Sequence, residues 1–154
     1  ALIRTLIGLV PAIILTSPLF GVSILKLGLP LLLLFLSLYT FGITLGLLVS
    51  AGLIRYGPSF ENIAWSSLFL LAPLGCIYYP IEILPNFFQL VAKGLPLVYI
   101  FDETRNILLN GFVNYENLRQ AYLLNIFYLI FGIGLFCLSF IRARVKGTLI
   151  NMGE

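Results

Sequence analysis

The chain has 154 residues, of which 60% are hydrophobic and 10% are charged, with nine Lys and Arg against six Asp and Glu. A soluble domain carries roughly 25% charged residues, so this composition does not cover a water-facing surface and indicates a membrane protein. With no His and only two Cys, the composition argues against zinc, haem and iron–sulfur chemistry, and the net charge of +3 argues against nucleic-acid binding.

Uncharged apolar runs occupy four stretches of the chain, residues 5–25, 27–54, 62–81 and 120–141. About 20 helical residues cross a hydrocarbon core roughly 30 Å thick. The pattern therefore predicts an all-α polytopic membrane protein in a single transmembrane domain. Its four transmembrane helices are expected over 5–24, 29–53, 61–79 and 117–141. Because the chain begins with Ala directly before a span, we expect it to be the C-terminal part of a longer protein.

The first two predicted helices form a tight antiparallel hairpin around a short turn at residues 26–28. Gly57 and Pro58 then break the chain. Ser59 is expected to cap the third helix, whose first turn contains Glu61.

A stripe of small residues follows one face of the second predicted helix, at Gly42, Gly46 and Ser50. Such a stripe allows another helix to approach closely, as a packing or dimer seam, although Gly is also generally frequent in membrane helices. Thr44 on this helix and Asn125 on the last one could hydrogen-bond between helices or line a polar path.

Between the third and fourth spans, the segment 80–116 is too apolar for a water-exposed loop. Pro85 and Pro96 suit the first turns of two short helices, over about 85–93 and 96–110, with Gly94 and Gly111 after them. Because neither is long enough to span, we expect external interfacial or re-entrant helices. A fifth span here would place Asp102, Glu103 and Arg105 at its centre, at about 2.5–3.5 kcal/mol each.

Positive charge sets the expected orientation. Arg142, Arg144 and Lys146 follow the last span directly, so the positive-inside rule predicts that both ends of the chain are cytoplasmic, in a multi-pass protein of the cell membrane. The segment 80–116 then faces outward.

The four apolar runs contain no charged residue, and the chain has no phosphate-binding loop and no Ser–His or paired-carboxylate set. We therefore predict no catalytic, metal-binding or cofactor-binding residues. The cluster of Asp102, Glu103 and Arg105 is either a structural latch or a substrate contact at an exit. As a latch, its charges would pair with each other, with Arg119 or with lipid headgroups.

The segment after the third span carries a succession of motifs, Tyr79-Pro80-x-x-x-Leu84-Pro85, then Leu95-Pro96-x-x-Tyr99, then Thr104-Arg105, before a final span and a basic tail. This succession resembles the C-terminal part of ABC-2 type transporter permeases, over essentially the whole chain. The resemblance implies an external-helix motif with a structural or exit-gate role. Its residues are Tyr79, Pro80, Leu84, Pro85, Leu95, Pro96, Tyr99, Glu103 and Arg105.

By the same resemblance, the chain holds the last four spans of a six-span permease. Such a permease pairs with a second copy, a homodimer in the simplest case, and with separate ABC ATPase subunits that bind and hydrolyse ATP. The loop containing Arg55, Tyr56 and Glu61 would then face the ATPase. Drugs, lipids and lipid-linked glycans all suit such an exporter as cargo. The alternative class is a non-transporting membrane scaffold or assembly subunit.

Overall fold

The computed structural model describes residues 28–146, so the first predicted span, over 5–24, lies outside the described residues. The chain divides into two compact units, residues 1–33 and 34–154. Of the first unit the structure describes only the first turns of α2, where Leu29 and Leu32 are exposed. The contacts reported below lie within the second unit.

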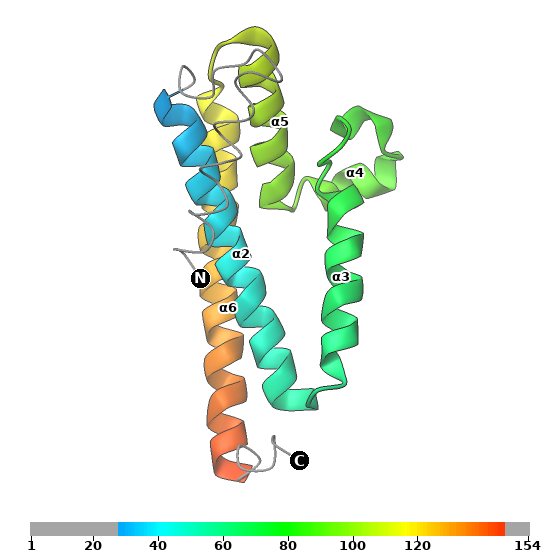
Figure 1. The fold of residues 1–154 in the computed structure, drawn as a ribbon, viewed down its shortest axis with the longest axis vertical. Coiled ribbons are helices and arrows are strands. Elements are labelled where there is room, and N and C mark those ends of the chain that lie inside the picture. The colour runs from blue at the N-terminus through cyan, green and yellow to red at the C-terminus, as the bar shows by residue number, and fades with distance from the viewer. Residues whose placement is uncertain (1–27, 147–154) are drawn as a thin grey trace, which may run out of the picture. The chain divides into compact units, whose positions relative to one another are not determined.

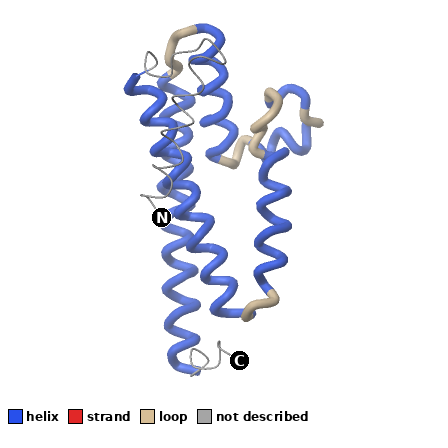
Figure 2. Tube along the Cα trace, viewed as in Figure 1, coloured by secondary structure: helices blue, strands red, loops and turns tan. Residues whose placement is uncertain are grey.

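The described chain is helical, and no strand occurs between residues 28 and 146 (Figures 1 and 2). This confirms the all-α prediction. In chain order the elements are α2 (Gly28–Tyr56), α3 (Phe60–Leu74), the 3-10 turn η2 (Ile81–Ile83), α4 (Asn86–Ala92), α5 (Pro96–Asn110) and α6 (Tyr115–Lys146).

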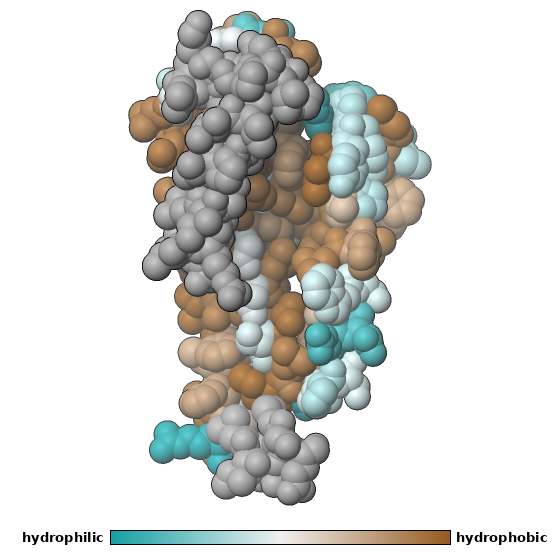
Figure 3. Space-filling model, in the orientation of Figure 1, coloured by the Kyte–Doolittle hydropathy of each residue, from teal (hydrophilic) through white to brown (hydrophobic). Residues whose placement is uncertain are grey.

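Two of these helices, α2 and α6, are long and apolar enough to cross a membrane. Only 22% of the most apolar window of α2 and 11% of that of α6 are buried, whereas the core helix of a soluble protein is mostly buried. Hydrophobic side chains accordingly cover much of the surface shown in Figure 3. The second and fourth predicted spans are thus present as helices of spanning length.

The third predicted span is shorter than the sequence indicated, because α3 ends at Leu74 rather than Tyr79. Its 15 residues extend roughly 22 Å at 1.5 Å per residue. Pro73 lies in its last turn and lacks an amide hydrogen, and Cys76 adopts a left-handed conformation with φ of 53°, which a continuing helix does not allow. Hydropathy alone overestimated this helix.

A close contact between α2 and α6 is made by small and polar side chains. Asn125 of α6 donates from Nδ2 to the Ser37 backbone carbonyl at 2.9 Å and to the Ser37 hydroxyl at 2.7 Å. A Cβ at Gly132 would lie 3.4 Å from the Thr44 methyl group, so the missing side chain allows the two helices to approach. Asn125 therefore hydrogen-bonds between helices, whereas the Thr44 hydroxyl donates to the Thr40 carbonyl of its own helix at 3.1 Å.

The short helices predicted over 85–93 and 96–110 are present as α4 and α5. Pro85 directly precedes α4, Pro96 is in the first turn of α5, and Gly111 ends α5 with φ of 74°, a conformation that glycine adopts easily. Ser59 takes the position before α3, but its hydroxyl forms no capping bond, so that detail of the prediction is wrong.

Candidate functional site, a polar junction on α5

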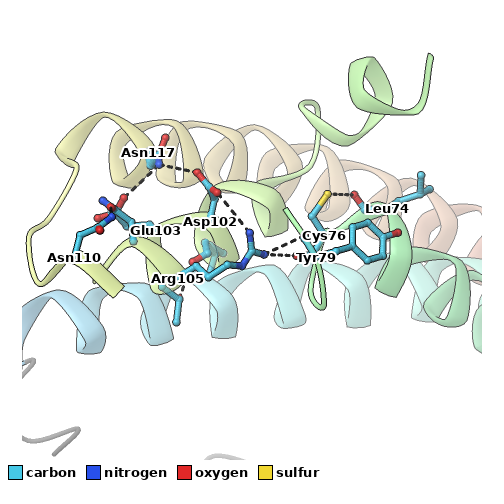
Figure 4. A network of polar contacts seen from close by, with 11 residues as sticks. Leu74, Cys76, Tyr79, Asp102, Glu103, Arg105, Asn110 and Asn117 are labelled. Carbon is cyan, nitrogen blue, oxygen red and sulfur yellow. Dashed lines mark hydrogen bonds and ion pairs between the residues drawn. The ribbon is translucent and has the colours of Figure 1, made fainter. Parts of the chain in front are cut away.

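The charged residues of α5 form the centre of a polar network that reaches two other parts of the chain. We call this network the polar junction and define it as Asp102, Glu103 and Arg105 together with the groups that they bind, on Cys76, Tyr79, Asn114 and Asn117 (Figure 4). Its position depends on α5, which packs along α6 through a buried apolar face that includes Ile100 and Ile107.

Arg105 connects α5 to the turn that follows α3. Its Nη2 donates to the Cys76 carbonyl at 2.7 Å and to the Tyr79 carbonyl at 3.1 Å, and its Nη1 lies 3.7 Å from Asp102 Oδ1. Carbonyl groups at the C-terminal end of a helix carry partial negative charge and have no partner within the helix. The guanidinium therefore binds backbone groups just past the end of α3.

Glu103 connects the same helix to the start of α6. Its side chain is fully buried, and its Oε1 accepts the backbone N–H of Asn114 at 2.6 Å. Asn114 is the residue before α6, and its own side chain accepts the N–H of Glu116 at 3.0 Å. A carboxylate at the positive end of a helix is favourable. Glu103 thus supports the residue that caps α6.

Asn117 joins the two carboxylates of the junction. Its Nδ2 lies 3.3 Å from Asp102 Oδ2 and 3.3 Å from Glu103 Oε2. Across residues 28–146, no Lys or Arg forms an ion pair with Glu103. Neutral N–H donors therefore have to compensate for the burial of this carboxylate.

Of the pairings that the latch hypothesis allowed, the described residues show one. Asp102 pairs with Arg105 as the latch hypothesis expected, but Arg119 pairs with Glu116 at 2.7 Å instead. That pair is well exposed and contributes little to stability.

Cys76 is the strained residue of the junction. Its φ of 53° is unusual for a residue with a side chain, and its thiol is buried against Ala92 and Val98. This residue lies in the turn after α3, outside the candidate spans. Burial raises the pKa of the thiol, and the positive charge of Arg105 opposes that rise.

Several predicted motif residues meet around the same apolar cluster. Tyr79, Leu84 and Leu95 pack against Cys76, Ala92 and Val98. Two tyrosines of the motif also close local turns, since the Tyr79 hydroxyl donates to the Pro73 carbonyl at 2.8 Å and the Tyr99 hydroxyl donates to the Lys93 carbonyl at 3.1 Å. Among the motif prolines, Pro80 precedes η2. These residues shape the connection between α3 and α5.

The stripe of small residues lies apart from the contact with α6. A Cβ at Gly42 or Gly46 would meet nothing within 4 Å, and the Ser50 hydroxyl binds back to the Gly46 carbonyl at 2.7 Å. The packing seam along this stripe therefore remains a prediction, and the helix that would pack on it is not among the described residues.

The loop predicted to face an ATPase is exposed. The Arg55 guanidinium lies 5.4 Å from the centre of the Tyr56 ring, which stacks on Phe60, and Glu61 is in the first turn of α3. These residues form a small aromatic and charged group, separate from the polar junction in the sequence and in its contacts.

An open depression of about 860 Å³ lies beside the polar junction. Its lining combines carboxylates, asparagine amides and one guanidinium with a few apolar side chains. The residues include Glu82, Asp102, Arg105, Asn106, Asn110, Asn114, Glu116 and Asn117. No group of three or more potential metal ligands occurs within the described part of the chain.

Sequence reasoning missed Asn114 and Asn117, both of which hold the junction carboxylates. The predicted last helix began at residue 117, so the capping position was overlooked. An Asn just before Tyr115 and Glu116 is a recognisable start signal for a helix, and it could have placed the boundary correctly.

Comparison of the chain with family models, with curated proteins and with solved structures finds no match. Its class is therefore defined by its composition, its helices and the polar junction.

Proposed function

We propose that this chain is the membrane-spanning permease subunit of an ATP-driven exporter of the ABC-2 type, acting as a dimer with separate ATPase subunits. The observation that carries the proposal is the order of helices after α3. Two short helices, α4 and α5, lie between α3 and the long apolar helix α6, with their bounds close to those expected for external helices. In this proposal the chain has four spans, which are residues 5–24, α2, α3 and α6. The third of them, α3, is short.

The exposure of α4 supports an interfacial position for this helix. Phe87 is 72% exposed, and Phe88 and Val91 are also exposed, although α4 has only seven residues. Large apolar side chains around so short a helix are unfavourable in water and favourable at the boundary between headgroups and acyl chains. Lys93, at the end of α4, is exposed and suits the same boundary.

The proposed orientation has a direct test. In a full chain with Cys76→Gly and Cys137→Ser, single cysteines replace Tyr115 or Val145, which are 75% and 83% exposed. A membrane-impermeant maleimide added to intact cells should label position 115 and not position 145. Labelling of 145 alone would reverse the orientation and contradict the proposal.

The transport function is tested by reconstitution with an ATPase. The chain is co-expressed with a candidate ABC ATPase from the same genome, and the complex is purified and placed in proteoliposomes. We expect ATP hydrolysis that depends on both proteins, together with ATP-dependent movement of a fluorescent lipid or drug. The chain alone should show no nucleotide-dependent thermal shift.

Two matched variants separate the exporter from a scaffold. Glu61→Ala alters the loop proposed to face the ATPase, whereas Glu82→Ala removes an exposed carboxylate from η2. Loss of ATPase retention with Glu61→Ala but not with Glu82→Ala supports the exporter. Equal retention by both variants contradicts the proposed ATPase contact, and retention without any ATP-dependent transport favours the scaffold.

A further inference from the structure

We propose that α3 is a lever held in one position by a clasp, and that the clasp consists of Arg105 and the two carbonyls that it binds, those of Cys76 and Tyr79. When the clasp opens, α3 swings relative to α5 and α6. This inference concerns the conformations of the chain and does not depend on what the chain transports.

The first observation is that α3 has almost no packing along its length against the other described residues. Ala64 is the one buried residue among its 15, while Trp65 is 57% exposed and Phe69 is 77% exposed. In Figure 1, α3 runs separately from the pair formed by α5 and α6. A helix with few buried contacts is held mainly by its ends, and its position is correspondingly easy to change.

The second observation concerns the N-terminal end of α3 and the turn before it. Gly57 has φ of 76° in the turn between α2 and α3, and the Phe60 ring occupies the space beside Gly52. The Gly57 backbone conformation is available mainly to glycine, and hinges are commonly a few residues in such turns. This end supplies a pivot and a small aromatic contact.

The third observation concerns the opposite end, where the clasp lies. One guanidinium nitrogen of Arg105 donates to both carbonyls, at 2.7 and 3.1 Å, and therefore both bonds are lost together when the side chain moves. The backbone that it holds includes Cys76 in a strained left-handed conformation. The hydrogen bonds of the clasp compensate for this strain. The turn is therefore expected to rearrange when these bonds are lost.

The clasp is also tied to α6. Asp102 lies 3.7 Å from Arg105 and accepts a hydrogen bond from Asn117 of α6 at 3.3 Å. A chain of side chains thus runs from the end of α3 through Arg105 and Asp102 to the start of α6 (Figure 4). The two carbonyls, the guanidinium and the carboxylate form one connected unit that is either closed or open.

The experiment measures two quantities in the full chain embedded in lipid nanodiscs. The first is hydrogen exchange of the amides of residues 75–79, by mass spectrometry. The second is the distance distribution between spin labels on α3 and α6, at Phe69 and Ile130, which are 77% and 66% exposed. Cys137→Ser and Cys76→Ala remove the native thiols for labelling, and Ala keeps both the backbone carbonyl and the Cβ at position 76, so the strain of its positive φ is retained.

Arg105→Ala should speed exchange at 75–79 roughly ten- to a hundredfold, since hydrogen bonds to a charged group are lost. It should also add a second population to the distance distribution. Arg105→Lys, which keeps the charge but lacks the planar fork, should lie between Arg105→Ala and wild type. The matched control is Arg119→Ala, which removes an exposed arginine near the same end of the molecule and should change neither quantity.

An unchanged, single distance in Arg105→Ala would overturn the lever, even if exchange at 75–79 increased. Unchanged exchange would overturn the clasp itself. If Arg105→Ala fails to fold, Arg105→Lys decides the matter through the same two measurements, and a distribution and exchange identical to those of wild type would contradict the proposal.

Discussion

Replacing Glu103 with Gln removes the negative charge beside the start of α6 while keeping the size of the side chain. The carboxylate accepts the Asn114 N–H at 2.6 Å and lies 3.3 Å from the Asn117 amide nitrogen. A Gln carbonyl can retain the first bond, but its NH₂ group then faces the NH₂ group of Asn117. The substitution therefore weakens one bond and removes the other.

The magnitude follows from these contacts. Hydrogen bonds to a charged group contribute about 1.5–3 kcal/mol and neutral ones about 1 kcal/mol, so weakening one bond and losing the second costs about 2–5 kcal/mol. Loss of the interaction with the positive end of α6 adds about 0.3–1 kcal/mol. Relief of the cost of burying a charge opposes both effects. We expect a net loss of about 1–3 kcal/mol.

Unfolding of the full chain in mixed micelles, titrated with SDS and followed by the helical circular dichroism signal, measures this loss. The matched control is Glu116→Gln, a carboxylate of α6 that is 56% exposed and pairs with Arg119. We expect the control to lose no more than about 1 kcal/mol. A Glu103→Gln protein as stable as wild type, or more stable, would show that the cost of burial exceeds the value of the bonds and would refute this account of the junction.

Two further substitutions test helix contacts by the same unfolding measurement. Gly52→Ala should destabilise the chain by about 1–3 kcal/mol, because its Cβ would overlap the Phe60 ring. The control Gly46→Ala, whose Cβ would meet nothing within 4 Å, should be neutral or slightly stabilising. Equal effects of the two substitutions would contradict the predicted overlap. Asn125→Leu should cost no more than about 1 kcal/mol, since it removes two bonds to Ser37 but also a buried Oδ1 that has no partner among the described residues. A loss above about 2 kcal/mol would show that this oxygen is bound in the membrane.

The short helices could be predicted from the sequence because their signals are local. Pro96 fixes the first turn of α5 and Gly111 permits the left-handed residue that ends it. Both boundaries therefore depend on one or two residues at the boundary itself. The existence of α2 and α6 as long helices was equally accessible, because an unbroken apolar run is a strong signal for a long helix, although both helices extend beyond the predicted bounds of 29–53 and 117–141.

The end of α3 has a local signal in Pro73, which hydropathy alone overlooks, but the turn beyond it also depends on a distant contact. The apolar run continues beyond Leu74, and the turn at Cys76 is held by Arg105, which lies 29 residues further along the chain. A contact at that separation depends on where α5 lies in the folded chain, which the local sequence around Cys76 does not show. The burial of Glu103 has the same origin, since the sequence places an acidic residue on a short helix but does not show which side of that helix the next one covers.

The spacing of charges on α5 explains how so short a helix serves two partners. At about 100° per residue, Glu103 and Arg105 point in nearly opposite directions, whereas Asp102 and Arg105 share one side. The acidic side chain meets the positive start of α6, and the basic one meets carbonyls beyond the end of α3, so each charge lies beside the helix end of opposite sign. A shift of either charge by one position would rotate it by about 100° and remove it from its partner. The two contacts therefore require this order and spacing of charged residues on α5. Ordinary solvent-exposed charges would not require any particular order or spacing.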